Sequence, residues 1–452
     1  MNLRRIVWNP IFFFHVELMT GMKKMNNVLD FGARGDGIAK DTAPVQTALD
    51  AGGIVFFPPG TYLCGTLYLR SNGGLELSPG AVLLASPDRE DYNADDFCPQ
   101  NRVAGQEKVS GAHFIVALEA ENVTIRGGGR IDGSREAFYS DWTPGYRDFN
   151  ITSWRPGQML YFCESRNIHL EDVQLYNAPY WTCFLHGCED VFVKGLRIYN
   201  DQRTANGDGI DIDCCRRVTV SDCIIDSGDD CITLRGNSAP LKNKGACEHI
   251  AITNCILHTC CNAIRIGVGN GIVRDCVISN IVFHETRTAI CIVSNYLSDK
   301  SKGVQIEDIL FSNLRMEAER AFVVLSSASG AQDYPAAKRI RNIQFRNVSG
   351  TVSEPSLIAG NAGGGVSGLL FDNIVFRHDC SRTLRIEKNP AAVFGEWNRL
   401  QPDGVFYIAN ASEIELTDVK VSCFNGVFPY SSGIVEYRTE KLRVNHCDFG
   451  LK

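Results

Sequence analysis

Val218-Thr-Val-Ser-Asp222 and Ile250-Ala-Ile-Thr-Asn254 are two copies of a short pattern in which two apolar residues alternate with other residues and an Asp or Asn follows. Alternation of this kind is typical of β-strands, whose side chains point in turn to opposite faces. Further copies occur at Ile168-His-Leu-Glu-Asp172, Val191-Phe-Val193, Val304-Gln-Ile-Glu-Asp308, Ile343-Gln-Phe-Arg-Asn347, Leu369-Leu-Phe-Asp-Asn373, Ile414-Glu-Leu-Thr-Asp418 and Leu442-Arg-Val-Asn-His446. The chain therefore carries an internal repeat along most of its length.

A short unit that cannot bury its own apolar face must stack on its neighbours, so the repeat predicts a solenoid. Because the units are strand-like and the signatures of leucine-rich and helical repeats are absent, we expect an all-β protein, a right-handed parallel β-helix. We find no Pro/Ser-rich linker and no shift in composition along the 452 residues. We therefore expect residues 25–452 to form a single domain, preceded by an N-terminal extension of uncertain nature at residues 1–24.

The first part of the domain resembles the start of a solenoid. The spaced apolar residues of Asp41–Leu49, with Asp41 or Thr42 as N-cap, predict a short helix that covers the open end of the core. Residues 53–62 and 75–82 are expected to be the first strands. In residues 1–24, two arginines before an apolar stretch are typical of a signal peptide, but no small-residue cleavage site follows.

Composition limits the classes of partner. The net charge of −7, with no basic run, disfavours nucleic acid, and no segment is long enough for a transmembrane helix. None of the 18 cysteines is part of a CxxC motif, and Cys214-Cys215 and Cys260-Cys261 are vicinal pairs. We therefore expect buried thiols and no metal site or other cofactor. Many thiols and a weak export signal favour the cytoplasm, with secretion as the alternative.

Three aspartates are the candidate catalytic residues: Asp208 in Asn206-Gly-Asp-Gly-Ile-Asp211, and the adjacent Asp229 and Asp230. They are separated by about one repeat, and neighbouring strands lie roughly 4.8 Å apart, so their side chains should share one patch of surface. Carboxylates that repel one another are tolerated where chemistry uses them. The alternative is that Asp and Gly mark turns.

These motifs resemble those of a known family. Asn206-x-Asp208-Gly-Ile-Asp211 followed by Gly228-Asp229-Asp230-Cys231 is similar to the paired signature of glycoside hydrolase family 28, the polygalacturonases and rhamnogalacturonan hydrolases. The Asp-Phe-Gly-Ala-x-Gly-Asp-Gly stretch near residue 30 and Pro-Pro-Gly-Thr-Tyr at 58–62 resemble the first coils of pectin-degrading β-helix enzymes. The resemblance covers roughly residues 27–450.

The resemblance implies inverting hydrolysis of a pectic polysaccharide or oligosaccharide. Asp229 would be the general acid, and Asp208 and Asp230 would hold and deprotonate the attacking water, at about 6.5 to 9.5 Å from the acid. Asn206 and Asp211 would orient this set by hydrogen bonding. For Asp211 and Asp213, an exposed strand position is the alternative.

The departures from the family pattern concern cationic residues. Asn262 stands where polygalacturonases have a histidine, and Cys291-Ile-Val293 replaces their Arg-Ile-Lys. Arg235 and Arg265 are the candidate substitutes for binding a carboxylate, and an ordinary surface role is the alternative for each. On this basis we expect poor cleavage of simple polygalacturonate and a preference for less acidic or rhamnose-containing fragments.

The segment from Phe138 to Trp154 is an insertion rich in aromatic residues, and Tyr180-Trp181 follows in the next coil. Such side chains stack on sugars or anchor loops, and a loop that closes one end of the site would favour exo-action. Two other classes share this architecture: a calcium-dependent pectate-lyase-like enzyme and a non-catalytic carbohydrate-binding β-helix. The oligomeric state is left open.

Overall fold

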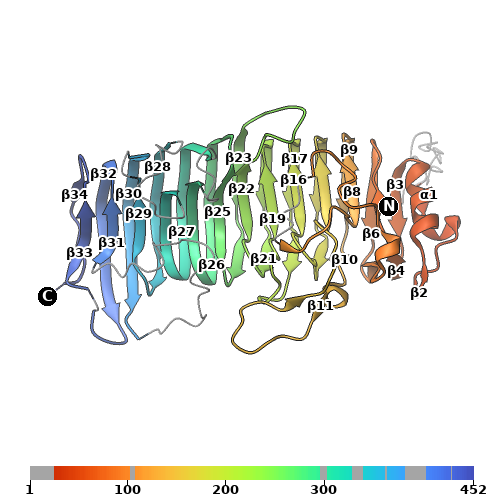
Figure 1. The fold of residues 1–452 in the computed structure, drawn as a ribbon, viewed down its shortest axis with the longest axis horizontal. Coiled ribbons are helices and arrows are strands. Elements are labelled where there is room, and N and C mark those ends of the chain that lie inside the picture. Colours follow the sequence, from red (N-terminus) through yellow and green to blue (C-terminus); the bar gives the residue numbers. More distant parts are fainter. Residues whose placement is uncertain are drawn as a thin grey trace, which may run out of the picture.

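The computed structural model describes residues 25–101, 107–295, 303–327, 339–361, 364–381, 404–428 and 430–451. Within these residues the strands pair in parallel, coil upon coil, and the two ends of the solenoid lie far apart (Figure 1). The predicted fold, a right-handed parallel β-helix, is confirmed, in keeping with the right-handed rule for parallel crossovers. Residues 1–24, where a signal peptide was considered, lie outside the described part.

Each coil adds one strand to each of three parallel ladders. The first ladder contains β5 (Leu67–Tyr68), β8 (Ile115–Leu118), β13 (Leu160–Cys163), β16 (Cys183–His186), β19 (Ile210–Asp213), β22 (Ile232–Gly236), β25 (Asn262–Gly269), β29 (Ser356–Ala359), β31 (Gly404–Ala409) and β33 (Ser432–Tyr437). The second contains β1 (Asn26–Asn27), β3 (Gly53–Phe57), β6 (Gly73–Leu77), β9 (Glu121–Arg126), β14 (Arg166–Glu171), β17 (Glu189–Lys194), β20 (Arg216–Ser221), β23 (Cys247–Thr253) and β34 (Arg443–Asn445).

The third ladder contains β2 (Asp36–Lys40), β4 (Gly60–Cys64), β7 (Ala81–Ala85), β10 (Arg130–Asp132), β15 (Gln174–Tyr176), β18 (Arg197–Tyr199), β21 (Ile224–Ser227) and β24 (Ile256–Thr259). Long strands bend through more than one ladder in the C-terminal half: β26 (Ile272–Asn295), β27 (Gln305–Ser327), β28 (Ile340–Val352), β30 (Val366–Asp379) and β32 (Ala411–Phe424). The first strands are thus β1 and β2, earlier than the sequence pattern predicted.

The core is built from the apolar positions of the repeat. The register aligns Val191, Val218 and Ile250 in consecutive coils, and all three are buried. Further along, Phe311, Phe345 and Phe371 stack in the same way, with ring centroids 5.1 and 4.9 Å apart. Each coil therefore buries its apolar face against identical positions of its neighbours, as expected for a solenoid.

The Asp or Asn that ends the repeat turns the chain between the second and third ladders. Asp222, Asn254 and Asn373 all have a positive φ of 55 to 58°, a conformation that Asn and Asp adopt more readily than most residues. Some of these side chains also bond along the solenoid, since the Asn373 amide donates to the Asn347 side chain at 2.9 Å. The polar residue of the repeat is therefore required by the backbone.

Helix α1 (Thr42–Asp50) covers the N-terminal end of the core, as predicted, with Val45, Ala48 and Leu49 buried. Asp41 is the N-cap residue, as predicted, but its side chain makes no hydrogen bond to the helix. The Asp41 carboxylate accepts hydrogen bonds from the backbone N–H groups of Arg34 and Gly35, at 2.8 and 2.9 Å, and none from the helix. Three short 3-10 helices are also described, η1 (Val28–Phe31), η2 (Arg89–Asp91) and η4 (Arg135–Phe138). None of the described helices is long and apolar enough to cross a membrane.

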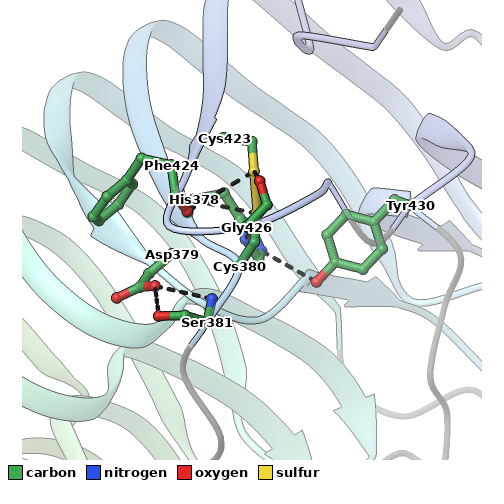
Figure 2. Close-up of a disulfide and its surroundings, with 8 residues drawn as sticks. All are labelled: His378, Asp379, Cys380, Ser381, Cys423, Phe424, Gly426 and Tyr430. Carbon is green, nitrogen blue, oxygen red and sulfur yellow. Dashed lines mark hydrogen bonds between the residues drawn. A yellow bond between two sulfur atoms is a disulfide. The ribbon is translucent and has the colours of Figure 1, made fainter.

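Most cysteines are buried thiols, as the sequence predicted. Among the described residues, 16 cysteines are free, and of these only Cys447 is not buried. One pair, Cys380 and Cys423, forms a disulfide that joins the end of β30 to β32 (Figure 2). Beside it, the His378 ring lies 3.1 Å from the Tyr430 hydroxyl.

The insertion leaves the solenoid between β10 and β13. It contains η4 and a separate antiparallel pair, β11 (Tyr139–Ser140) and β12 (Asn150–Ile151), and projects from one side of the solenoid near its middle (Figure 1). The neighbouring first-ladder strands β16, β19, β22 and β25 carry the candidate site.

Candidate active site

The predicted site residues gather at the start of three consecutive first-ladder strands. Asp208 precedes β19, Asp229 and Asp230 precede β22, and Asn262 begins β25. Ladder hydrogen bonds continue upstream of the strands, since Gly209 N–H donates to the Asp230 carbonyl at 2.9 Å and Cys231 N–H to the Asn262 carbonyl at 3.1 Å. Residues one coil apart are therefore held level with each other.

The carboxylates of Asp229 and Asp230 are close neighbours. One oxygen of each, together with the Cys261 Sγ, lies within 4.8 Å of the others. This approach is shorter than the 6.5 to 9.5 Å expected between acid and base, so that expectation does not hold for Asp230. Asp208 is not part of this close trio.

Burial and mutual repulsion favour the protonated forms of the buried carboxylates. Desolvation, and then the charges of Asp211, Asp229 and Asp230, raise the pKa of Asp208 well above its ordinary value. Desolvation and the Asp229 charge also raise the pKa of Asp230, although Arg265 and the Asn262 hydrogen bond oppose this. The Asp208 Oδ1 is buried without a hydrogen-bond partner among the described residues. Burial thus makes both groups easier to protonate than an exposed carboxylate.

Asp211 lies on the outer face of β19 yet is fully buried, so the exposed-strand alternative is wrong for it, as it is for Asp213. The Thr233 hydroxyl donates to Asp211 Oδ1 at 2.5 Å, and Arg235 Nη1 lies 3.4 Å from the same oxygen. Arg235 Nε also lies 3.5 Å from Asp213 Oδ2. Burial raises the pKa of Asp211 to about 7, against the opposing effects of Arg235 and Thr233.

The two asparagines of the site have different contacts. The Asn262 Nδ2 donates to Asp230 Oδ1 at 2.7 Å, so it positions a candidate catalytic carboxylate. Asn206, which was expected to orient the aspartates, accepts at Oδ1 a 3.0 Å bond from Arg155 Nη2. Arg155 is fully buried and donates five further bonds, four to backbone carbonyls and one to the Tyr139 hydroxyl. Asn206 is therefore held by Arg155, and Asp211 by Thr233 and Arg235.

Arg235 and Arg265 are both buried parts of the site, so the surface alternative is wrong for each. Arg235 packs over the Trp181 ring at 4.3 Å, and its side chain is 13% exposed. Arg265 lies level with Thr233 and Cys291 in the ladder, and its Nη1 lies 3.9 Å from the Cys291 Sγ. Cys291 belongs to an apolar cluster on the outer face, with Val293, Val323, Leu325, Leu357, Ala359 and Ala409.

Two cationic residues near the aspartates were missed by the sequence analysis. Arg147, from the insertion, places Nη2 3.6 Å from Asp229 Oδ2 and donates to the Gly228 carbonyl at 2.8 Å. Arg287, on β26, donates to the Cys261 Sγ at 3.0 Å and opposes the raised pKa of Asp230. The site therefore contains cationic residues in addition to the two candidates, Arg235 and Arg265. A lone arginine in an insertion gives no periodic signal from which its place could be predicted.

The aromatic residues of the insertion divide into two groups. Tyr139 and Tyr180 are buried anchors, and the Tyr139 hydroxyl donates to the Pro179 carbonyl at 2.8 Å. Trp142 and Tyr146 are 40% and 69% exposed, so these two remain available to a sugar.

Asp229, Asp230 and Cys261 are spaced so that they could surround a metal ion. The guanidinium groups of Arg147 and Arg287 contact Asp229 and Cys261, so positive charge is already present there. This donor set fits a cation poorly.

Comparison with known proteins agrees with the fold and the motifs. The model of glycosyl hydrolases family 28 matches residues 96–392, more than half of the chain, and a rhamnogalacturonase A/epimerase, pectate lyase-like model matches residues 25–68. A probable polygalacturonase from Vitis vinifera is 28% identical over 46% of this chain, and the match spans only 44% of that relative. A polygalacturonase from Persea americana is 23% identical over 78% of this chain and 81% of its own length.

Solved structures of the same architecture cover nearly the whole chain. The family 28 exopolygalacturonase of Yersinia enterocolitica has a TM-score of 0.69 at 19% identity, covering 92% of this chain and 78% of that one. The exopolygalacturonase of Thermotoga maritima has a TM-score of 0.63 at 20% identity, covering 92% of each chain. These structures share the fold, and the match of the family model establishes that the chain belongs to glycosyl hydrolase family 28.

Proposed function

We propose that this enzyme hydrolyses glycosidic bonds of a galacturonan or rhamnogalacturonan fragment with inversion, and that Asp208, Asp229 and Asp230 are its catalytic residues. The observation that carries the proposal is the meeting of three carboxylates at the starts of β19 and β22, in environments that differ in burial. Asp208 is 5% exposed, whereas the Asp229 side chain is 22% exposed.

The difference in exposure suits a division of labour. Asp229 faces solvent, where a glycosidic oxygen can approach, and it acts as the general acid. Asp208 is buried with one unpartnered oxygen that can hold the attacking water, and Asp230, whose ionised form is stabilised by Arg265 and Asn262, can accept the proton of that water. Asp230 lies close to Asp229 and is held by Asn262, and it helps to orient the attacking water.

A further aspect of the proposal is exo-action on oligosaccharides. The insertion stands against the site, since Arg147 reaches Gly228 and Asp229, and Phe149 N–H donates to the Arg203 carbonyl at 2.9 Å. A loop held at one end of the binding site limits the length of chain that extends past the cleaved bond. Release of single sugars or disaccharides from chain ends would support this aspect, and random internal cleavage would contradict it.

The catalytic assignment is tested with Asp229→Asn. This variant keeps the size of the side chain and removes the proton donor, so we expect kcat to fall by several orders of magnitude on a substrate with a poor leaving group, with an unchanged circular dichroism spectrum. Substrates are polygalacturonate, rhamnogalacturonan and neutral plant oligosaccharides, with products resolved by chromatography. Asp190→Asn, in β17 and paired with Arg217, is the matched control.

Two outcomes would refute the proposal. Full activity of Asp229→Asn would remove it as the acid. An unsaturated product that absorbs in the ultraviolet, or loss of activity with a chelator, would indicate a calcium-dependent lyase.

A further inference from the structure

Resting on the proposed function, we propose that Arg147 is the specificity-determining residue for an acidic sugar: its guanidinium binds the carboxylate of the sugar at the cleaved bond and, in doing so, leaves Asp229. The guanidinium of Arg147 belongs to the Phe138–Trp154 insertion and not to the repeat.

The guanidinium is held in a defined orientation. Nε lies 2.9 Å from Asp148 Oδ1, and Nη2 donates to the Gly228 carbonyl at 2.8 Å. The same Nη2 lies 3.6 Å from Asp229 Oδ2, a contact longer than the other two. Among the described residues, Nη1 has no contact with an acceptor. The edge formed by Nη1 and Nη2 is therefore the part of the group that can bind a carboxylate in the two-pronged manner favoured by arginine.

Arg147 is also accessible from solvent. Its side chain is 18% exposed beside the 22% exposed side chain of Asp229, so a ligand that reaches the acid also reaches this arginine. The other arginines of the site are less suitable. Arg235 lies between Asp211 and Asp213, and Arg155 is fully buried with six hydrogen bonds.

Binding of an acidic sugar at Arg147 has a geometric consequence for Asp229. When the sugar carboxylate takes over the guanidinium, the contact between Arg147 Nη2 and Asp229 Oδ2 is released, and the Asp229 carboxyl group can turn toward the glycosidic oxygen. Recognition of the acidic sugar is thereby coupled to the placement of the acid.

The test compares Arg147→Gln and Arg147→Lys with the wild type, on a galacturonate oligosaccharide and on its fully methyl-esterified form. For the free acid we expect Arg147→Gln to lower kcat/KM by about 30-fold to 1000-fold, as for loss of a charged partner of a desolvated carboxylate. For the ester, which carries no carboxylate, we expect less than about a threefold change. Arg147→Lys keeps the positive charge but lacks the two parallel N–H donors of the guanidinium, so its kcat/KM on the free acid should lie between those of the wild type and Arg147→Gln.

The matched control is Arg203→Gln. Arg203 packs over Phe149 of the same insertion at 4.4 Å but contacts none of the three aspartates, so it reports on loosening of the insertion alone. Equal losses on acid and ester, or the same pattern in Arg203→Gln, would overturn the proposal. Calorimetric measurement of the binding of the free acid tests the role of Arg147 independently of the proposed hydrolytic function. Weaker binding to Arg147→Gln supports the role of Arg147 even if no substrate is turned over, and equal binding by wild type and variant refutes it.

Discussion

Replacement of Asp211 by Asn should make the protein more stable at high pH and change the pH dependence of its stability. Burial raises the pKa of Asp211 from 3.8 to about 7. Between these two values the folded protein binds a proton that the unfolded chain does not bind, so wild-type stability falls as pH rises. A rise of about three pH units at 1.36 kcal/mol each gives about 4 kcal/mol. Asn keeps the acceptor for the Thr233 hydroxyl and carries no charge, so the variant lacks this loss.

The assay is urea unfolding of both proteins at about pH 4 and about pH 8. The free energy of unfolding of Asp211→Asn, relative to wild type, should increase by about 4 kcal/mol between the two conditions. The control is Asp190→Asn, because a hydrogen bond from Arg217 lowers the pKa of the exposed Asp190 and predicts a smaller change of opposite sign. Parallel pH profiles for wild type and Asp211→Asn would show that the carboxyl group is not kept protonated by burial.

Two more predictions concern buried arginines. Arg265→Ala should weaken cleavage of an acidic substrate more than that of its neutral ester, because the positive charge of Arg265 near Asp230 also attracts a substrate carboxylate. Measurement of kcat/KM on the two substrates checks this, and equal losses or no loss would rule it out. Arg155→Met should lower the free energy of unfolding by on the order of 3 kcal/mol, because buried acceptors lose their donor, and calorimetry measures it. An unchanged melting temperature would contradict that reasoning.

The sequence predicted the fold because a repeat carries the same information many times. Val218 and Ile250 point inward, and Asp222 and Asn254 turn the chain with a positive φ, so both parts of the pattern reflect a physical requirement. The meeting of the aspartates followed from the same register. The position of a residue can be inferred from the sequence when the residue that it contacts also lies within the repeat.

Other features depended on contacts outside the repeat. Arg147 reaches Asp229 from an insertion without periodicity, and the sequence gives no register for such a loop. Asp41 sits at a helix start, but its carboxylate binds the backbone of the preceding turn. The partner of Asp211 was available in principle, because alignment of the two coils places Thr233 opposite it.

The insertion leaves the solenoid after β10 and returns at β13, and both strands are paired with their neighbours on either side. Asp208, Asp229 and Asp230 lie on later coils, which are joined to one another by backbone bonds such as those from Gly209 to Asp230 and from Cys231 to Asn262. With the roles that we propose for Arg147 and the three aspartates, substrate preference and bond cleavage are encoded in separate stretches of the gene. Exchange of residues 138–154 for another loop of suitable length could change which sugar is accepted while the cleavage chemistry is inherited intact, a route open both to natural divergence and to the engineer.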